Sequence, residues 1–448
     1  MPISMTNTPE VIDLLIEARW VATVESDTVL KNHAVAIDKG RIKAILPASE
    51  ARPRYSPRTL HVLPDHILIP GLINLHTHAA MSLMRGIADD LPLMEWLQKH
   101  IWPTESAHLS AQFVYDGTRL ACAEMLKSGV TCFNDMYFFP DAAARAASEM
   151  GMRATLGITT LEFPTPFASD AEDYLTKGLA VREKWHDNKL IQFCLAPHAP
   201  YTVSNDTFEH VLTLSEQLNL PIHCHIHETR QEIEDSLKQH GRRPLARLHG
   251  LGLLGPNFIG VHAVHLDPAE IELLASTGSN IAHCPTSNLK LASGFAPVAQ
   301  MRQAGINLGL GTDGAASNNR LDLFGEMRLA ALLAKGTSGD ASALPAGEVL
   351  HMATLGAASA LGLASEIGSL APGKQADLCA VSLGDPESRP CFDPLAHLIN
   401  VAGRENVTHV WVAGKCCVDN KTLRIDNQND LESALALWQN VLEFRHRQ

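Results

Sequence analysis

Histidines recur at alternate positions in two short apolar segments. The segment LINLHTH ends in His76 and His78. The segment PIHCHIHE contains His223, His225 and His227. Side chains two residues apart in a β-strand project from the same face, so each set of imidazoles can converge on one point. Imidazole is a common metal ligand, and buried histidines are costly unless they are solvated or bound. The spacing indicates a metal site, and it leaves open which histidine of the second segment is a ligand.

Two acidic residues follow strand-like segments. Glu228 comes directly after the histidine-rich segment, where a proton carrier could stand, although a solvated loop glutamate is the ordinary alternative. Asp313 follows the segment NLGLGT. Glycines around Asp313 would let a ligand or metal approach the backbone closely, while Thr-Asp-Gly is also a common turn. These carboxylates add a candidate proton carrier and a candidate ligand to the histidines.

Four further histidines lie at or near the ends of apolar segments: His198, His262, His265 and His283. Each one alone is compatible with a structural histidine that is held by hydrogen bonds. Their joint occurrence at strand ends is the argument for a shared site. Motifs of other metal or nucleophile sites are absent from the sequence, including H-E-x-x-H, P-C-x-x-C, G-x-S-x-G and phosphate-binding glycine loops.

The elements that must position these residues begin at Pro70. From there, short apolar segments alternate with amphipathic stretches that end in glycine, which is typical of βα units and a parallel sheet. The eight expected strands are LINLHTH, VTCFNDM, RATLGIT, QFCLAPH, PIHCHIHE, FIGVHAV, NIAHCP and NLGLGTD. We therefore expect a (β/α)₈ barrel over residues 70–365. Catalytic groups of such barrels stand at the C-terminal ends of the strands, where these polar residues lie.

Short strands also flank the barrel on both sides. Residues 1–69 contain Val- and Ile-rich segments, with a hairpin expected at Asp38-Lys39-Gly40. Residues 366–448 return to strands in GSLAPGKQADLCAVSL and THVWVAGKCCVDN, and end in an amphipathic helical stretch, LESALALWQNVLEFRHRQ. We expect the two ends of the chain to form one small β-sandwich domain beside the barrel.

The composition limits the partners. The 448 residues carry a formal net charge of −13, whereas a protein that binds nucleic acid carries a basic excess. Nine cysteines without a C-x-x-C pair favour reduced thiols in the cytoplasm. Neither a signal peptide nor an apolar run of membrane-spanning length is evident. We expect a cytoplasmic homo-oligomer that acts on a small molecule, without nucleic-acid or membrane partners.

The chain resembles the amidohydrolase superfamily and, more narrowly, the 5′-methylthioadenosine/S-adenosylhomocysteine deaminases. The resemblance covers nearly the whole chain and is more specific for the superfamily than for the substrate. It rests on the segments PGLINLHTHAAMSLMRGIADDLPLMEWL, APHAPYT, HCHIHET, VHAVHL, AHCPTSNLKLASG, GTDGAASNN and GSLAPGKQADL.

The resemblance assigns roles to individual residues. The implied ligands of a single Zn²⁺, with Fe²⁺ as an alternative, are His76, His78, His225 and Asp313. The implied substrate contacts are Glu105, His198, Glu228 and Asp313, and the implied catalytic residues are Glu228, His262 and Asp313. His227 stands where the family more often has an apolar or small residue.

The resemblance also implies a hydrolytic deamination that yields an inosine analogue and ammonia. Asp313 would take the proton of a metal-activated water. Glu228 would protonate the ring nitrogen next to C6 and pass a proton to the leaving ammonia. His262 would hydrogen-bond the attacking water or the tetrahedral oxygen. Glu105 would accept both ribose hydroxyls.

Three alternatives stay open. The first is a deaminase of a free base or a triazine, such as a guanine-type base, cytosine or a chlorotriazine. The second is a cyclic amide hydrolase, whose carboxylated lysine is missing because the fourth strand ends in His198. The third is a metal-binding scaffold, which would have no need of Glu228 and His262. The Pro- and Phe-rich segment 162–174 is expected to act as a lid that brings Phe163 or Phe167 to the bound ligand.

Overall fold

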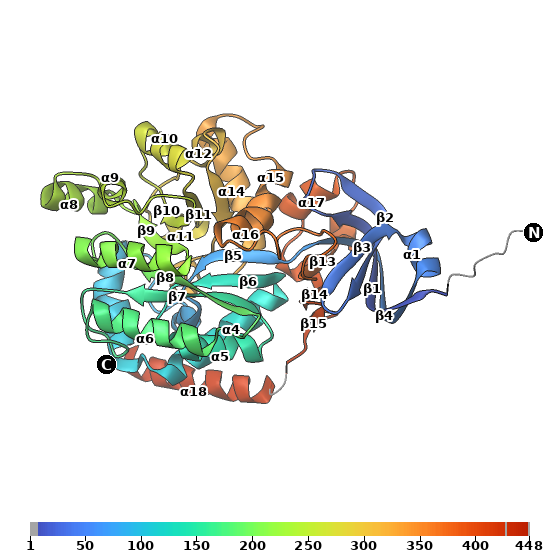
Figure 1. The fold of residues 1–448 in the computed structure, drawn as a ribbon, viewed down its shortest axis with the longest axis horizontal. Helices are drawn as coiled ribbons and strands as arrows, with labels where there is room; N and C mark the ends of the chain where they lie inside the picture. The colour runs from blue at the N-terminus through green and yellow to red at the C-terminus, as the bar shows by residue number, and fades with distance from the viewer. Residues whose placement is uncertain (1–7, 426–427, 447–448) are drawn as a thin grey trace, which may run out of the picture.

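The computed structural model describes residues 8–425 and 428–446, and its larger unit is a barrel of parallel strands (Figure 1). Eight strands pair in sequence order, and each one coincides with a predicted segment. They are β5 Leu72–Thr77, β6 Val130–Asp135, β7 Arg153–Thr160, β8 Ile191–Pro197, β9 Ile222–Ile226, β10 Phe258–His262, β11 Asn280–His283 and β12 Asn307–Leu310. Strand β12 lies against β5, so the sheet curls back on its first strand. The predicted (β/α)₈ barrel is confirmed.

Helices connect the strands and cover the barrel. Between β5 and β6 lie η1 Ala79–Met84, α2 Leu93–Trp96, η2 Leu97–Ile101, α3 Trp102–His108 and α4 Ala111–Lys127. The later connections contain α5 Pro140–Glu149, α6 Ala171–Lys184, α7 Asn205–Leu218, α8 Arg230–His240, α9 Pro244–Gly250, α10 Pro268–Thr277, α11 Pro285–Lys290 and α12 Val298–Gln303. After β12 come α13 Ala315–Asn318, α14 Leu323–Ser338, α15 Ala346–His351, η3 Met352–Gly356 and α16 Ala357–Ala360.

Local sequence explains where these helices begin and end. The Asp267 side chain accepts a hydrogen bond from the amide of Glu270 and completes a capping box at the start of α10. The same helix ends at Gly278, whose φ of 71° is the left-handed conformation that glycine adopts without strain. Helix α4 begins at Ala111 because Ser110 caps it by accepting a hydrogen bond from the amide of Phe113.

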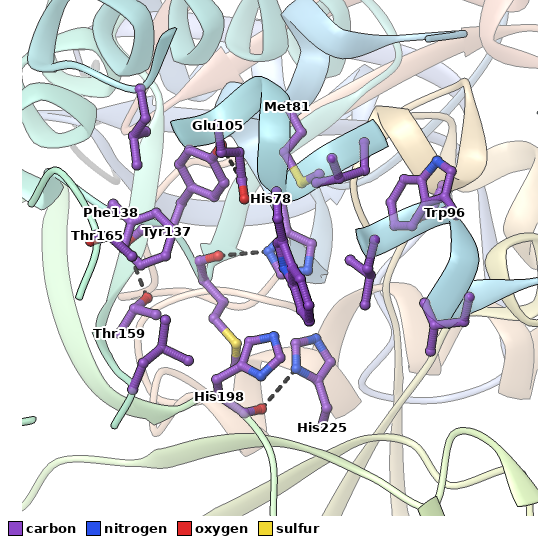
Figure 2. A pocket seen from close by; sticks show the side chains of 18 of the residues that line it. His78, Met81, Trp96, Glu105, Tyr137, Phe138, Thr159, Thr165, His198 and His225 are labelled. Carbon is purple, nitrogen blue, oxygen red and sulfur yellow. Dashed lines mark hydrogen bonds between the residues drawn. The ribbon is translucent and has the colours of Figure 1, made fainter. Parts of the chain in front are cut away.

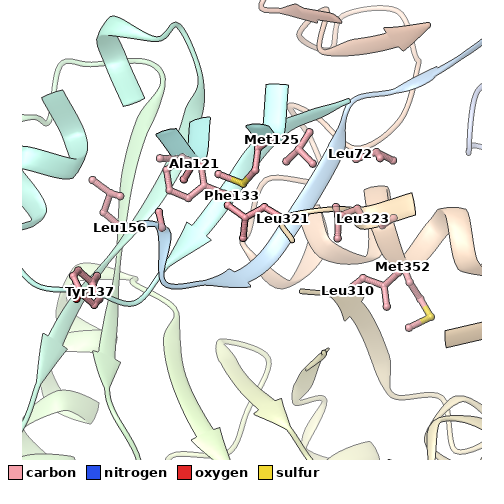
Figure 3. Packing of buried hydrophobic residues seen from close by; sticks show 14 of the residues in the cluster. Leu72, Ala121, Met125, Phe133, Tyr137, Leu156, Leu310, Leu321, Leu323 and Met352 are labelled. Atoms are coloured by element: carbon pink, nitrogen blue, oxygen red, sulfur yellow. The ribbon is translucent and has the colours of Figure 1, made fainter. Parts of the chain in front are cut away.

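The core lies between the strands and the covering helices. Figure 3 shows Leu72 and Phe133 of neighbouring strands packed near Met125 of α4 and Leu323 of α14. Such side chains are fully or almost fully buried, and their removal from water is the main driving force for folding. The packed interior holds the strand ends in place for the site that they carry.

The two ends of the chain form the second unit, a mixed sheet beside the barrel. Its strands are β1 Glu10–Ala22, β2 Val29–Asp38, β3 Arg41–Pro47, β4 Tyr55–Pro70, β13 Leu378–Ser382, β14 Val407–Val412, β15 Lys415–Asp419 and β16 Thr422–Leu423. Strand β13 pairs antiparallel with β4, which joins the N-terminal strands, blue in Figure 1, to the C-terminal strands, red. Both sets of strands share one hydrophobic core. The predicted small β-domain from both chain ends is confirmed.

The remaining segments complete this unit and the C-terminus. Helix α1 Ala48–Arg54, η4 Pro386–Ser388, α17 Pro394–Asn400 and η5 Arg404–Asn406 lie in the connections of the sheet. The predicted hairpin at Asp38-Lys39-Gly40 joins β2 to β3, with positive φ at Lys39 and Gly40.

The terminal helix α18 Gln428–His446 packs on the barrel rather than on the sheet (Figure 1). The ring of Trp438 lies 5.2 Å from that of Phe113, and its indole N–H donates to Asp116 at 2.9 Å. The first seven residues of the predicted N-terminal segment and the last two of the predicted helix lie outside the described residues. Of the helices that are described, none has the length and apolar character needed to cross a membrane.

Candidate active site

Four predicted ligand side chains converge at the C-terminal end of the barrel. The Nε2 atoms of His76 and His78 lie 3.3 Å and 3.2 Å from Oδ1 of Asp313. The Nε2 atom of His225 lies 3.3 Å from that of His76. Donor atoms bound to one zinc at about 2.0–2.1 Å in a tetrahedron lie about 3.3 Å apart. The chemistry and spacing of these donors therefore fit one divalent metal ion.

The barrel closure sets the spacing between the first and last of these residues. Asp313 follows β12 with a φ of 62°, and its amide donates to the carbonyl oxygen of His76 at 3.0 Å. A Cβ atom at Gly311 would stand 2.9 Å from the Cβ of His76. Glycine was expected here to admit a ligand. In the structure, its missing side chain makes room for the backbone nitrogen and Cβ of His76 and for the sulfur of Cys284.

Each histidine at the centre is held through its other ring nitrogen. Nδ1 of His78 donates to the carbonyl oxygen of Met136 at 2.6 Å, and Nδ1 of His225 donates to that of His198 at 2.8 Å. These bonds place the proton on Nδ1 and leave Nε2 as a free donor atom toward the centre. Nδ1 of His76 lies 3.0 Å from Nε2 of His223, and both side chains are fully buried. Burial lowers the pKa of His225 and lowers that of His76 to about 4, which favours neutral imidazoles at these two positions. The pKa of His78, which burial lowers, is raised to about 9 by its hydrogen bond to Asp313 and by the charge of that carboxylate.

The expectation that His223, His225 and His227 share one face fails at His227. Strand β9 ends at Ile226, and His227 has a φ of 52°, so the alternation stops before it. Nε2 of His227 accepts a hydrogen bond from the amide of Leu245 at 3.0 Å, away from the centre. His223 lies behind His76, and of the three only His225 reaches the candidate metal position.

Glu228 and His262 stand beside the centre. Oε2 of Glu228 lies 3.8 Å from Nε2 of His262. The Nδ1–H of His262 donates to the amide oxygen of Asn288 at 2.8 Å, which turns Nε2 toward Glu228. Glu228 is 6% exposed, and burial raises the pKa of its carboxyl above the usual range. A carboxyl group with a raised pKa is suited to carry a proton.

A cavity of about 360 Å³ opens onto these residues (Figure 2). Predicted substrate contacts lie on its wall: Glu105 in α3, and His198 just beyond β8. The hydroxyl of Tyr137 donates to Oε1 of Glu105 at 2.6 Å. Burial raises the pKa of Glu105 to about 7, and this hydrogen bond opposes the rise. Nδ1 of His198 lies 3.0 Å from Oγ1 of Thr202.

The predicted lid contributes one of its two phenylalanines to this cavity. Phe163 lies on the cavity wall, and its ring centroid is 6.3 Å from that of Trp102 on the opposite segment. Phe167 packs against Phe139 and Tyr174 instead, at 5.1 Å and 6.0 Å between ring centroids. The residue expected to reach a ligand is therefore Phe163.

Comparison with known proteins places the chain in a family. The Amidohydrolase family matches residues 67–417. The chain belongs to the amidohydrolase family. A relative from Saccharophagus degradans, named 5-methylthioadenosine/S-adenosylhomocysteine deaminase, is 48% identical over 437 residues, which cover 97% of this chain and 98% of the relative. A relative of the same name from Teredinibacter turnerae is 44% identical, with coverage of 98% and 99%.

A solved structure resembles the amidohydrolase described here over its full length. It is an adenosine deaminase from Xanthomonas campestris with bound zinc, 48% identical, with a TM-score of 0.96. The superposition covers 98% of this chain and 100% of that one.

Several residues around the amidohydrolase centre were missed by sequence reasoning. Oδ2 of Asp313 accepts hydrogen bonds from the hydroxyls of Ser287 and Ser317 at 2.6 Å and 2.7 Å. These bonds fix one carboxylate oxygen and leave Oδ1 directed at His76 and His78. Asn288 beside His262 was also missed. The three polar side chains stand in segments quoted for the family resemblance, AHCPTSNLKLASG and GTDGAASNN, but spacing alone assigns them no partner.

The two other histidines considered from the sequence do not join the centre. Nε2 of His265 donates to the carbonyl oxygen of Ser293 at 2.7 Å, as a structural histidine would. His283 is buried, and within the described part of the chain neither of its ring nitrogens has a hydrogen-bond partner.

The contact between His76 and His223 generates a prediction about metal affinity. Replacing His223 by leucine removes the group that holds the His76 ring, so the affinity for Zn²⁺ should fall by about 10–100-fold. Competition with a chromophoric chelator measures this change directly. His283→Leu is the matched control, because it also removes a buried strand histidine but should leave zinc affinity unchanged. Equal affinities of His223→Leu and the unmodified protein would contradict the role.

Proposed function

We propose that this protein is a zinc-dependent deaminase that converts 5′-methylthioadenosine and related adenosine-type nucleosides to the inosine analogues and ammonia. The observation that carries the proposal is one cavity in which a three-histidine, one-carboxylate cluster, the buried acid Glu228 and the separate carboxylate Glu105 face the same space. The names of the relatives and of the zinc-bound structure support it.

The proposed zinc ligands are His76, His78, His225 and Asp313. Neutral imidazoles with one carboxylate are a typical zinc donor set, and Fe²⁺ is the alternative that such ligands accept. A bound ion of this kind lowers the pKa of water to about 7 and so supplies a nucleophile at neutral pH. Metal analysis of the purified protein should find one equivalent of zinc per chain.

The protein residues around the ligands supply the proton transfers. Asp313 directs Oδ1 to the centre and would accept the proton of the attacking water. Glu228, whose raised pKa favours the protonated carboxyl, would donate its proton to the ring nitrogen next to C6, then take the remaining proton of the attacking hydroxyl group and pass it to the leaving ammonia. The proton held by Asp313 would restore the acid form of Glu228. The Nδ1–H of His262 donates to Asn288, so Nε2 faces this space and would hydrogen-bond the attacking water or the tetrahedral oxygen.

The opposite wall of the cavity would bind the sugar. Tyr137 donates to Oε1 of Glu105, which holds the carboxylate in place and leaves it room to accept further donors. The 2′ and 3′ hydroxyls of a ribose are two such donors on adjacent carbons. His198 lies on the same cavity wall and offers a further polar contact to the nucleoside. A free base would leave the Glu105 carboxylate without these partners.

Replacing the acid tests the proton-transfer step. Glu228→Gln should keep its zinc, because Glu228 is not a proposed ligand. Its kcat should fall by at least about 10²-fold, the usual scale of a general acid or base. Metal content and turnover are measured on the same preparation. A variant that loses zinc and regains full activity when zinc is restored would disprove the role.

The ribose contact tests the substrate class. Ammonia release should be much faster from 5′-methylthioadenosine and adenosine than from 2′-deoxyadenosine or adenine. A half-buried carboxylate left without partners costs roughly 1–3 kcal/mol, about 5-fold to 150-fold in kcat/KM. Glu105→Ala should abolish this preference with zinc content unchanged. If adenine or guanine is the best substrate of the unmodified protein, the proposal is wrong and the protein is a deaminase of free bases.

The raised pKa of Glu105 predicts a pH dependence of binding. Its carboxylate is mostly protonated below pH 7 and ionised above it, and only the ionised form accepts both ribose hydroxyls. The Kd of 5′-methylthioinosine should therefore fall by about tenfold between pH 6 and pH 8, from the change in ionised fraction. Isothermal titration calorimetry measures it. Glu105→Gln should flatten the profile, and an equally steep profile in that variant would contradict the assignment.

A further inference from the structure

The described residues that line the cavity include neither lysine nor arginine. Among the described residues that line it, the acidic side chains are three carboxylates, Glu105, Glu228 and Asp313. The remainder are aromatic, aliphatic, small polar and histidine side chains, and neither lysine nor arginine is among them. Apart from the histidine cluster and a metal bound there, the charged side chains of the described lining residues are therefore carboxylates.

The position of Glu105 fixes the region that a 5′ substituent must occupy. In a ribose, C5′ is bonded to the carbon next to the one that bears the 3′ hydroxyl, so a 5′ substituent lies close to the group that binds the hydroxyls. Trp102 stands one turn before Glu105 in α3, and its ring lies 6.3 Å from that of Phe163 on the lid side of this region. Tyr137 and Phe138 follow β6 and complete the wall, as Figure 2 shows near Glu105.

Lysines on the neighbouring elements are bound elsewhere. Nζ of Lys177 in α6 donates to Asp173 and to the carbonyl oxygen of Phe167, both at 2.8 Å. Nζ of Lys290 in α11 donates to Asp89 and Asn319 at 2.6 Å and 2.8 Å. Either lysine would have to leave these partners to reach a ligand in the cavity.

We infer that the cavity selects nucleosides with a short uncharged 5′ substituent and discriminates against the carboxylate-bearing tail of S-adenosylhomocysteine. The inference rests on the proposed deaminase function and separates the two substrates in the relatives' names. A methylthio group gains from burial among aromatic side chains. The homocysteine tail carries an α-carboxylate and an α-ammonium; the ammonium can meet the wall carboxylates, whereas the carboxylate loses water and meets neither lysine nor arginine among the described lining residues. The raised pKa of Glu105 shows that these surroundings already disfavour one carboxylate charge.

Three substrates separate charge from size. We compare kcat/KM for 5′-methylthioadenosine, S-adenosylhomocysteine and 5′-butylthioadenosine, whose four-carbon chain matches the homocysteine tail without its charges. S-adenosylhomocysteine should be at least about 10²-fold poorer than 5′-methylthioadenosine, the scale expected when a buried charge lacks a partner. 5′-Butylthioadenosine should exceed S-adenosylhomocysteine by at least about tenfold. A smaller difference in kcat/KM between either pair of substrates overturns the inference. If no nucleoside releases ammonia, the proposed function itself is refuted, and the inference with it.

A variant that introduces a cation provides the reciprocal test. Phe163 is 40% exposed, so its position on the lid can hold a longer charged side chain. In Phe163→Arg, the kcat/KM ratio of 5′-methylthioadenosine to S-adenosylhomocysteine should fall by at least about tenfold, since a charge-assisted pair replaces an unpaired carboxylate. The inhibition constant of S-adenosylhomocysteine should fall in parallel. Phe163→Leu is the control, and its ratio should not fall. An arginine variant that behaves like the leucine variant overturns the charge explanation.

Discussion

The amide of Asp313 donates a hydrogen bond to the carbonyl oxygen of His76, and this bond joins the last strand of the barrel to the first. Chain positions more than two hundred residues apart thereby place their side chains around one point. Asn74 reinforces the junction, because its side chain accepts from the amide of Thr312 and donates to the Thr312 hydroxyl. Without closure of the barrel, His76 and Asp313 would lie on opposite edges of an open sheet. The proposed metal centre therefore depends on the same contact that completes the fold.

Polar groups at this junction are buried, and their hydrogen bonds determine what they can do. An imidazole whose Nδ1–H is bound to a backbone carbonyl, as in His78 and His225, must present Nε2 as an electron-pair donor. The hydroxyls of Ser287 and Ser317 donate hydrogen bonds to Oδ2 of Asp313, which leaves Oδ1 directed at the histidines. A metal ion supplies the positive charge that such a cluster of donors would otherwise lack. Hydrogen bonds within the protein therefore orient these donor atoms.

The sequence was sufficient for the features that follow from local periodicity. Apolar segments bounded by turns predicted all eight barrel strands. The alternation of side chains along a strand predicted that His76 and His78 lie on one face, because the alternation continues up to the end of that strand. It failed at His227, where a positive φ follows the strand and reverses the direction of the side chain. The roles of Ser287 and Asn288 depend on how α11 folds back over the barrel, and the contact of α18 with α4 depends on tertiary packing. The hydrophobic periodicity of a helix or strand indicates which face is buried, but it does not indicate which other element packs against that face.

The site divides into two parts that the fold supports in different ways. The residues proposed for chemistry stand at strand ends, where hydrogen bonds across the barrel hold them rigidly. The residues proposed for the 5′ substituent, Trp102 and Phe163, stand in connections that the barrel does not constrain. Barrel enzymes commonly change substrate through such connections while the strand ends keep the reaction. Many residues of the described cavity wall, which includes neither lysine nor arginine, stand in such connections. A charged tail could be accommodated by altering them without any change at the metal centre.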